Sequence, residues 1–115
     1  MRRGEIWVAN LNPNRGQEVG KIRPVVVIQD DRLLETALPT ILVLPLTTQV
    51  NPDFEPLRIT VRAREKLRQT CQVMVEQVRT LDRERFGEGP LTHLTALEMA
   101  AVERALAGAL GLRLA

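Results

Sequence analysis

The sequence predicts a mainly β (α+β) fold, in which a small, strongly bent antiparallel sheet or barrel carries one C-terminal α-helix. Five or so short apolar runs, rich in β-branched residues, are separated by segments that contain Pro, Gly, Asn and Asp. The final segment differs, because its apolar residues recur at helical spacing. Short strands followed by a single helix are typical of a curved sheet on which the helix docks.

Chain length and composition favour one domain over residues 1–115. A chain of 115 residues that is 44% hydrophobic can bury a core without disulfides or metals. Cys71 is the only cysteine and cannot form an internal disulfide, so we expect a small buried hydrophobe rather than a nucleophile. There is no leader-like N-terminus and no apolar run near the ~20 residues of a membrane span. We therefore expect a cytoplasmic protein without membrane association.

The first two strands are expected at residues 5–9 and 24–29, on either side of a polar loop. The second run, PVVVIQ, suits a buried strand, and Pro24 fits only at its start because proline has no N–H group. The intervening residues 10–22 contain the asparagine, proline and glycine residues that are typical of turns. We expect this loop to be mobile in the free protein.

The middle of the chain predicts a short helical turn and two more strands. Asp30 or its neighbour can cap a helical turn over residues 32–36. Residues 40–46, TILVLPL, are expected to form a strand, and Pro45 indicates that pairing stops there or that the strand lies at an edge. Residues 57–61 alternate apolar and polar, as a half-buried strand does.

The remaining segments lead to a terminal helix. We expect a helical turn at residues 63–67, a last strand at 72–77 and a turn at 79–82. Thr95 and Glu98 form the pattern of a capping box, which predicts that a helix begins there. The apolar stripe of this helix is Met99, Val102, Leu106 and Leu110.

The basic residues are unevenly distributed, although the net charge is only +2. Residues 58–68 contain a single acidic residue, Glu65, among five basic ones. The basic residues are Arg58, Arg62, Arg64, Lys66 and Arg68. This concentration fits a polyanionic partner, but a solvated protein face explains it equally well. Aromatic residues make up 3% of the chain, so stacking on nucleic-acid bases can contribute little.

Arg23 lies where the polar loop meets the second predicted strand. A fixed strand would hold its permanently charged fork at the mouth of an adaptable loop, which is one way to build an anion site. A surface arginine that merely flanks a strand is the alternative, and from this stretch alone it is the simpler one.

Further polar residues cluster near the ends of predicted strands. Glu18 lies on the loop, Thr47, Thr48 and Gln49 follow one strand, and Glu76 and Gln77 lie in another. If these strand ends converge with Arg23, the site offers a guanidinium, hydroxyls, amides and carboxylates, which suit phosphodiester chemistry without a metal. The alternative is that each residue satisfies backbone groups of its own turn. There is no P-loop, CxxC or HExxH motif, and His93 is isolated, so we expect no metal and no cofactor.

Several segments, taken in order, resemble one known family. They are residues 3–7 (RGEIW), 16–18 (GQE), 23–25 (RPV), 45–47 (PLT) and 76–82 (EQVRTLD). Together they are similar to the MazF/PemK/Kid toxins of bacterial toxin–antitoxin pairs, over nearly the whole chain. The resemblance implies an SH3-like barrel, a homodimer and a cognate antitoxin whose disordered tail occupies the RNA groove. It also implies metal-independent, sequence-specific cleavage of single-stranded RNA to 2′,3′-cyclic phosphate and 5′-hydroxyl ends.

The resemblance further implies which residues act. Gln17 and Met74 replace a histidine and an arginine of the Kid-like branch, so we follow the MazF-like branch, in which Arg23 and Thr47 are catalytic. Glu18 or Glu76 would be the general base. The residues expected to bind RNA are Gln17, Thr48, Gln77, Arg64 and Arg79.

Two other functions remain open at this point. One is a CcdB-like toxin that acts on a topoisomerase and has no nuclease activity. The other is a non-catalytic barrel that binds RNA or a peptide. The presence of both Arg23 and Thr47 favours the endoribonuclease.

Overall fold

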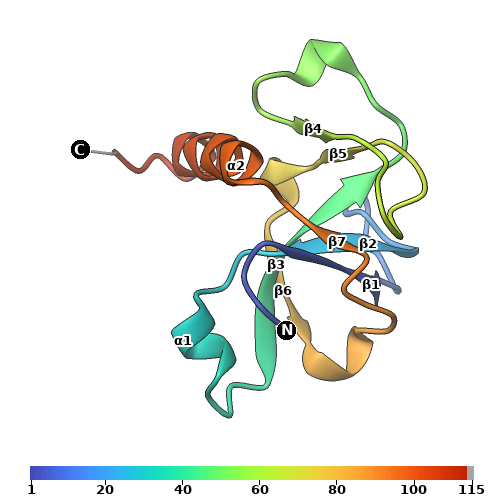
Figure 1. Ribbon diagram of the computed structural model, residues 1–115, viewed down its shortest axis with the longest axis vertical. Coiled ribbons are helices and arrows are strands. Elements are labelled where there is room, and N and C mark those ends of the chain that lie inside the picture. The colour runs from blue at the N-terminus through green and yellow to red at the C-terminus, as the bar shows by residue number, and fades with distance from the viewer. Residues whose placement is uncertain (114–115) are drawn as a thin grey trace.

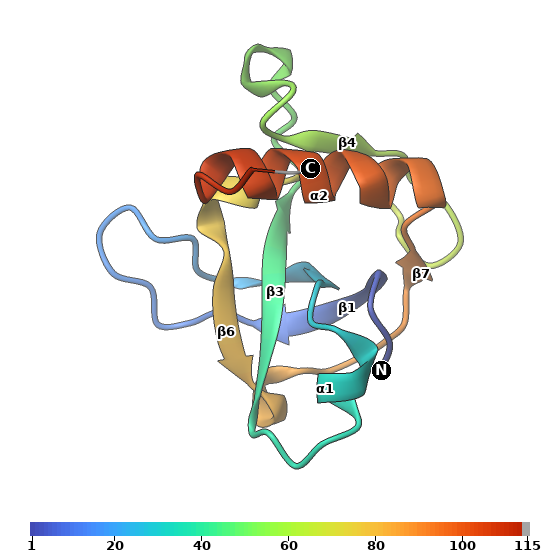
Figure 2. The same cartoon turned by 90° about the vertical axis from the view of Figure 1, so that its left-hand side faces the viewer.

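A computed structural model describes residues 1–113, so the last two residues of the predicted domain lie outside the described part. A seven-stranded antiparallel sheet curls around the core, and a C-terminal helix lies across one end of it (Figures 1 and 2). The strands are β1 (Glu5–Asn10), β2 (Ile22–Val27), β3 (Thr40–Thr47), β4 (Ile59–Val61), β5 (Cys71–Val73), β6 (Arg79–Asp82) and β7 (Thr92–His93). The helices are α1 (Asp31–Leu34) and α2 (Ala96–Ala109), with short 3-10 turns η1 (Pro52–Phe54), η2 (Val75–Gln77) and η3 (Arg83–Arg85). The predicted fold class is confirmed.

The sheet bends where β3 changes its partner. The strand order is β4-β5-β3-β2-β1-β7, and β6 also pairs with β3. On one edge of β3, β6 pairs with residues 40–43 and β5 pairs with Leu46 and Thr47. Pro45 lies between these two pairings, and it lacks the N–H group that a continuous ladder needs. The prediction that pairing stops at Pro45, or that this strand lies at an edge, is wrong: β5 replaces β6 as the partner at Leu46 and Thr47, and Val25 of β2 lies opposite Pro45 on the other edge.

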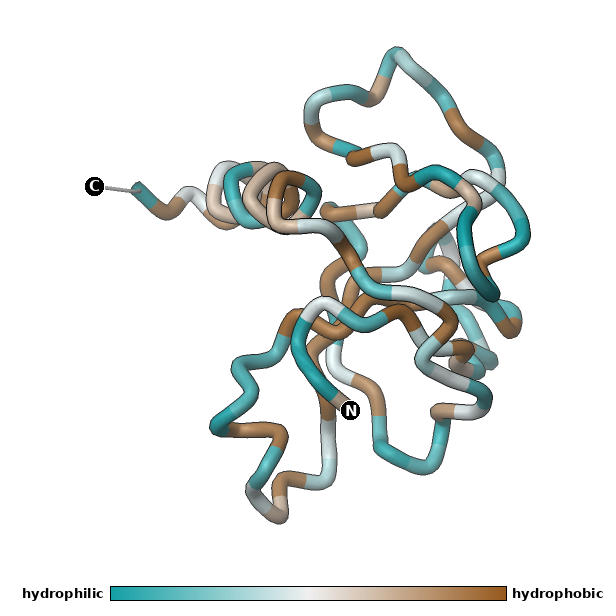
Figure 3. Tube along the Cα trace, viewed as in Figure 1, coloured by the Kyte–Doolittle hydropathy of each residue, from teal (hydrophilic) through white to brown (hydrophobic). Residues whose placement is uncertain are grey.

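Two clusters of buried side chains stabilise the curled sheet. The cluster under α2 contains Ile6, Val26, Leu44, Val61, Val73 and Val102. The cluster on the opposite face contains Leu11, Val25, Val27, Ile41, Val43 and Leu81. Successive residues of β2 thus enter opposite clusters, which explains why its apolar run is unbroken. In Figure 3 the hydrophobic segments concentrate where the strands meet.

The terminal helix begins at the predicted capping box. Thr95 Oγ1 accepts a hydrogen bond from the Glu98 N–H (3.1 Å), and Glu98 Oε1 accepts one from the Thr95 N–H (2.8 Å). Val102 is fully buried in the core, whereas Leu110 is 54% exposed, so the apolar stripe packs along only part of its length. Asp30 caps α1 as expected. None of the helices among residues 1–113 is both long and apolar enough to cross a membrane.

Three predicted segments are wrong in type. Residues 63–67 form a tight turn rather than a helical one, since Arg64 and Leu67 exchange two backbone hydrogen bonds. The strand predicted at 72–77 ends at Val73, so Glu76 and Gln77 lie in η2. Residues 79–82 form strand β6 instead of a turn. β5 and β6 pair with successive parts of β3, and η2 separates the two strands in the region of Pro45.

Two strand boundaries also shift. β2 begins at Ile22, two residues before the predicted start, and Pro24 is its third residue. Proline is tolerated there because the pairing of β2 with β3 begins only at Val25. The strand predicted at residues 57–61 is confirmed only from Ile59, because the chain before it forms a turn in which the Arg58 N–H donates to the Phe54 carbonyl (3.0 Å).

Candidate active site

A groove of about 680 Å³ lies where the start of β2, the end of β3 and the connection from β3 to β4 meet. Its polar lining contains several residues singled out from the sequence. Among its lining residues are Lys21, Arg23, Thr47, Thr48, Gln49, Asn51, Phe54, Arg58 and Met74. The predicted convergence of strand ends is therefore found for Arg23, Thr47, Thr48 and Gln49.

Arg23 is held by the backbone rather than by an acidic partner. Its Nε donates to the Gly20 carbonyl (2.8 Å), and its Nη1 donates to the Leu46 carbonyl (3.3 Å). The loop itself packs tightly at Gly20, where a Cβ would lie 2.7 Å from the Asn14 side chain. Partial burial lowers the pKa of Arg23 from its ordinary value, but a guanidinium remains charged at neutral pH. Within residues 1–113 no carboxylate forms a salt bridge with Arg23, so its positive charge is available to an anion in the groove.

Thr47 presents a hydroxyl at the same groove. Its Oγ1 accepts a hydrogen bond from the Gln49 N–H (3.1 Å), which fixes the oxygen at the last residue of β3. The hydroxyl proton remains free to donate into the groove. Thr48, which follows, is exposed on the rim. Arg23 and Thr47 therefore place a charged and a neutral donor in the same groove.

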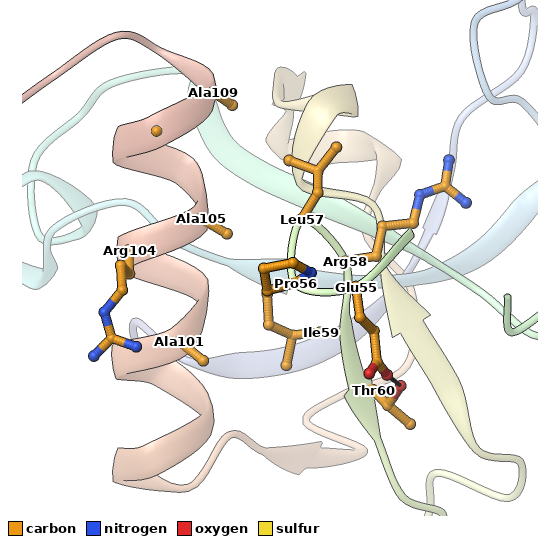
Figure 4. Close-up of a pocket in the computed structure, with 11 residues that line it drawn as sticks. Glu55, Pro56, Leu57, Arg58, Ile59, Thr60, Ala101, Arg104, Ala105 and Ala109 are labelled. Atoms are coloured by element: carbon orange, nitrogen blue, oxygen red, sulfur yellow. Dashed lines mark hydrogen bonds between the residues drawn. The ribbon is translucent and has the colours of Figure 1, made fainter. Parts of the chain in front are cut away.

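Arg58, which lines the groove, forms an ion pair with Glu76. Arg58 Nε donates to Glu76 Oε1 (3.1 Å), and Nη2 donates to Oε2 (2.5 Å). The Arg58 guanidinium also lies 4.4 Å from the centre of the Phe54 ring. Figure 4 shows the Arg58 side chain turned away from α2, whereas Pro56 lies on the side that faces this helix. Sequence reasoning counted Arg58 only within the basic segment; its position between apolar Leu57 and Ile59 was the signal that it faces the opposite side.

The ion pair determines the charge state of Glu76. Burial by itself raises the pKa of this carboxyl group, but the hydrogen bonds from Arg58 and from the backbone, with the positive charge of Arg58, outweigh it. The pKa of Glu76 is therefore lowered, and the group is an ionised, weakly basic carboxylate at neutral pH.

The loop between β1 and β2 projects from the sheet, at the left of Figure 2. Gln17 and Glu18 are exposed on it and do not line the groove. The Glu18 carboxylate accepts a hydrogen bond from the Arg15 N–H (3.1 Å), within the loop itself. Gln77 Oε1 accepts from the Val19 N–H (3.4 Å), and Arg79 Nη1 donates to the Val19 carbonyl (3.0 Å). In the structure Gln77 and Arg79 thus anchor the base of the loop.

Arg64, which the resemblance assigned to RNA binding, does not line the groove. Its Nη1 and Nη2 donate to the two carboxylate oxygens of Glu98 (3.0 and 2.6 Å), and Nη2 also donates to the His93 carbonyl (2.9 Å). The hydrogen bonds that Arg64 donates to the Glu98 carboxylate raise the pKa of Arg64. Arg64 therefore ties the 64–67 turn to the start of α2, and its charge is already neutralised. Lys66 and Arg68 instead line a small hollow of about 320 Å³.

That small hollow adjoins the groove, because Pro24 and Thr48 line both. Among residues 1–113 no three His, Cys, Asp or Glu side chains lie close enough to hold a metal ion together. Cys71 is buried in the core, as expected, and burial raises the pKa of its thiol. His93 is exposed in β7.

Comparison with solved structures shows the same fold in several toxins. MazF from Deinococcus radiodurans aligns with a TM-score of 0.82 at 24% identity, over 97% of each chain. An endoribonuclease in complex with its cognate antitoxin, from a mycobacterial species, aligns with a TM-score of 0.74 at 20% identity, over 100% of this chain and 97% of that one. At these identities the likeness concerns the fold alone.

Sequence comparison identifies the family as well as the fold. A protein named endoribonuclease MazF, from Staphylococcus saprophyticus, is 38% identical over 113 residues, which cover 97% of this chain and 92% of that protein. The family model of PemK-like, MazF-like toxins of type II toxin–antitoxin systems matches residues 2–110. With a near full-length match to this model and the expected curled sheet and terminal helix, the chain belongs to the PemK-like, MazF-like toxin family of type II toxin–antitoxin systems.

Proposed function

We propose that this protein is the toxin of a toxin–antitoxin pair and that it cleaves single-stranded RNA as a sequence-specific, metal-independent endoribonuclease. The observation that carries the proposal is the Arg23 guanidinium, which no carboxylate of residues 1–113 neutralises and which shares its groove with the Thr47 hydroxyl. The 38% identical relative named as an endoribonuclease supports the same reaction class.

The reaction uses the 2′-hydroxyl of the RNA as nucleophile. Its oxygen attacks the adjacent phosphorus in line while the bond to the 5′-oxygen breaks. The 2′-hydroxyl proton passes to a base and the leaving 5′-oxygen takes up a proton, so the products carry a 2′,3′-cyclic phosphate and a 5′-hydroxyl. Negative charge grows on the non-bridging oxygens in the transition state. Arg23 and Thr47 donate to these oxygens, and preorganised donors of this kind contribute about 3–4 kcal/mol each.

The proton transfers are assigned by charge state. Arg23 is a poor base, because its guanidinium is protonated at neutral pH. It acts as an electrostatic clamp and supplies the proton that the leaving 5′-oxygen takes up. Glu76 is a weak base because it is paired with Arg58. Glu18 remains the candidate base, and this role requires the loop at residues 10–22 to fold over the groove when RNA binds.

Sequence specificity comes from the polar side chains around the groove. Thr48 lies on the rim, and Gln77 and Arg79 lie at the base of the loop. Gln17 is exposed on the loop and reaches the RNA only when the loop closes. Hydroxyl and amide groups can read the edges of unstacked bases, which is how single-stranded RNA is usually recognised.

The proposal includes two protein partners. One is a cognate antitoxin whose disordered tail occupies the groove; a structural neighbour of similar fold is described in complex with its own antitoxin. The other is a second copy of this chain. β4 is the outermost strand on its side of the sheet, and an apolar hollow of about 720 Å³ lies beside it, lined by Pro56, Leu57 and Ile59 and by Ala101 and Ala105 of α2 (Figure 4). An unpaired strand edge beside an apolar surface suits a symmetric dimer.

The decisive experiment incubates the pure protein with a long unstructured RNA, with and without excess EDTA. The proposal expects cleavage in both samples, and product ends that carry a cyclic phosphate and a 5′-hydroxyl. Cleavage that stops on chelation and returns with magnesium contradicts the metal-free mechanism. Binding without cleavage indicates a non-catalytic barrel, and neither binding nor cleavage points to a CcdB-like toxin.

A further inference from the structure

We infer that Arg58 is a second catalytic guanidinium of the groove and that Glu76 and Phe54 position it. This inference rests on the proposed endoribonuclease function. It assigns a role to Arg58, which the basic segment alone did not single out, and it gives Glu76 a role other than general base.

The first argument is how firmly Arg58 is held. Glu76 binds it through two parallel hydrogen bonds of 3.1 and 2.5 Å, and the Phe54 ring lies 4.4 Å from the guanidinium carbon. The Arg58 backbone N–H also donates to the Phe54 carbonyl (3.0 Å). Only 17% of the Arg58 side chain is exposed. A bidentate pair and a ring contact fix the plane of the guanidinium, so little rotamer entropy is lost when it binds a ligand.

The second argument is what Arg58 still has to offer. A guanidinium carries five N–H donors, and Glu76 takes one from Nε and one from Nη2. Within residues 1–113 no other hydrogen bond engages this side chain, so three donors remain, both on Nη1 and one on Nη2. The side chain lines the groove that Arg23 and Thr47 also line, and it points away from α2 (Figure 4). A phosphate in the groove therefore meets guanidinium donors from two separate elements.

The two arginines are not equivalent. Arg23 has no carboxylate partner among the described residues and contributes a full positive charge, whereas Glu76 neutralises Arg58. Arg58 contributes directional donors rather than net charge. Donors that are fixed before the reaction stabilise the transition state without reorganisation. Glu76 therefore acts through Arg58 and is a positioning residue.

The test measures single-turnover cleavage at saturating enzyme, with wild type and Arg23→Ala as references. Arg58→Ala is expected to lower the rate of bound RNA about 100-fold with little change in the enzyme concentration for half-saturation. Arg58→Lys restores little, because an ammonium cannot make the two-pronged bond to Glu76. The matched control is Arg32→Ala on α1, where the arginine is 90% exposed and far from the groove, and it keeps the wild-type rate.

Glu76→Gln separates positioning from base catalysis. If Glu76 positions Arg58, the substitution lowers the rate but leaves the shape of the pH–rate profile unchanged, and the double variant Arg58→Ala/Glu76→Gln is no slower than Arg58→Ala. If Glu76 is the base, the low-pH limb of the profile disappears. That result overturns its positioning role.

Two further outcomes are distinguished by the references. Wild-type protein that does not cleave RNA refutes the proposed function itself. Wild type that cleaves, with Arg23→Ala slow and Arg58→Ala at the wild-type maximal rate, refutes only this inference. If a thermal melt shows that Arg58→Ala does not fold, Arg58→Lys and Phe54→Leu replace it in the rate measurement, because both substitutions leave a large side chain at the site. Wild-type cleavage rates in both variants would equally refute the inference.

Discussion

Replacing Arg23 by alanine separates catalysis from binding. The structure leaves three of the five N–H donors of Arg23 for RNA, because backbone carbonyls of Gly20 and Leu46 take two. Losing one preorganised donor raises the activation free energy by about 3–4 kcal/mol in a closed site. Arg23 is half-exposed, so we expect a value near the lower end of this range. At 1.36 kcal/mol per factor of ten, Arg23→Ala should slow single-turnover cleavage at saturating enzyme by about 100-fold. Arg23→Lys should recover little of this rate, since an ammonium cannot form a planar fork.

The comparison variants are Lys66→Ala and Arg68→Ala. Both side chains are exposed at the small hollow that adjoins the groove, so they can contact phosphates by charge. Each substitution should weaken RNA binding modestly and reduce the slope of log K against log salt concentration by about 1. The cleavage rate of bound RNA should stay nearly unchanged. Arg64 is unsuitable for this comparison because its ion pair with Glu98 supports α2.

Stability must be controlled in the same assay. Arg23→Ala removes two hydrogen bonds to backbone carbonyls, each worth about 1 kcal/mol. Rates are therefore compared well below the midpoint of each variant's thermal melt. If Arg23→Ala only raises the enzyme concentration for half-saturation and reaches the wild-type maximal rate, Arg23 is a phosphate anchor and the reasoning above is refuted.

Three further predictions concern assembly, dynamics and pH. Sedimentation at micromolar concentration should show a dimer, which Ala105→Glu in the apolar hollow disrupts and Ala100→Glu, on an exposed part of α2, leaves intact; a wild-type monomer would contradict the assembly. Residues 10–22 should exchange amide hydrogens faster than the strands and become protected with a non-cleavable RNA analogue, and equal protection of loop and strands would count against loop closure. Burial raises the pKa of Glu98, but its hydrogen bonds with Arg64 and Thr95 lower this pKa overall. Glu98 therefore stabilises the fold at pH values above its pKa in the unfolded chain, and this stabilisation is lost as the pH falls through its pKa in the folded protein. Glu98→Gln, which keeps the capping pattern, should cost roughly 1–2 kcal/mol in urea unfolding at pH 7 and progressively less below about pH 4; a cost that does not shrink in acid would exclude the ion pair as its cause.

Local sequence patterns were sufficient for the elements whose formation depends on neighbouring residues. The apolar runs of β1, β2 and β3 and the capping box at Thr95 and Glu98 appear as expected. Arg23 and Thr47 could be placed for the same reason, since each directly borders a strand predicted from the sequence, although their catalytic roles were implied only by the family resemblance. Turn-type composition likewise identified the loop after β1.

The tertiary structure alone decided which distant side chains pair. Residues 71–82 form two strands and a 3-10 turn because they follow β3 past Pro45, and no local pattern encodes that partner. Arg58 meets Glu76 across 18 positions, and Arg64 meets Glu98 across 34, so one basic segment is divided between the groove and the helix. The composition gives only the number of charges. Whether a guanidinium lies at the groove or pairs with a carboxylate elsewhere depends on the curl of the sheet, because that curl determines its neighbours.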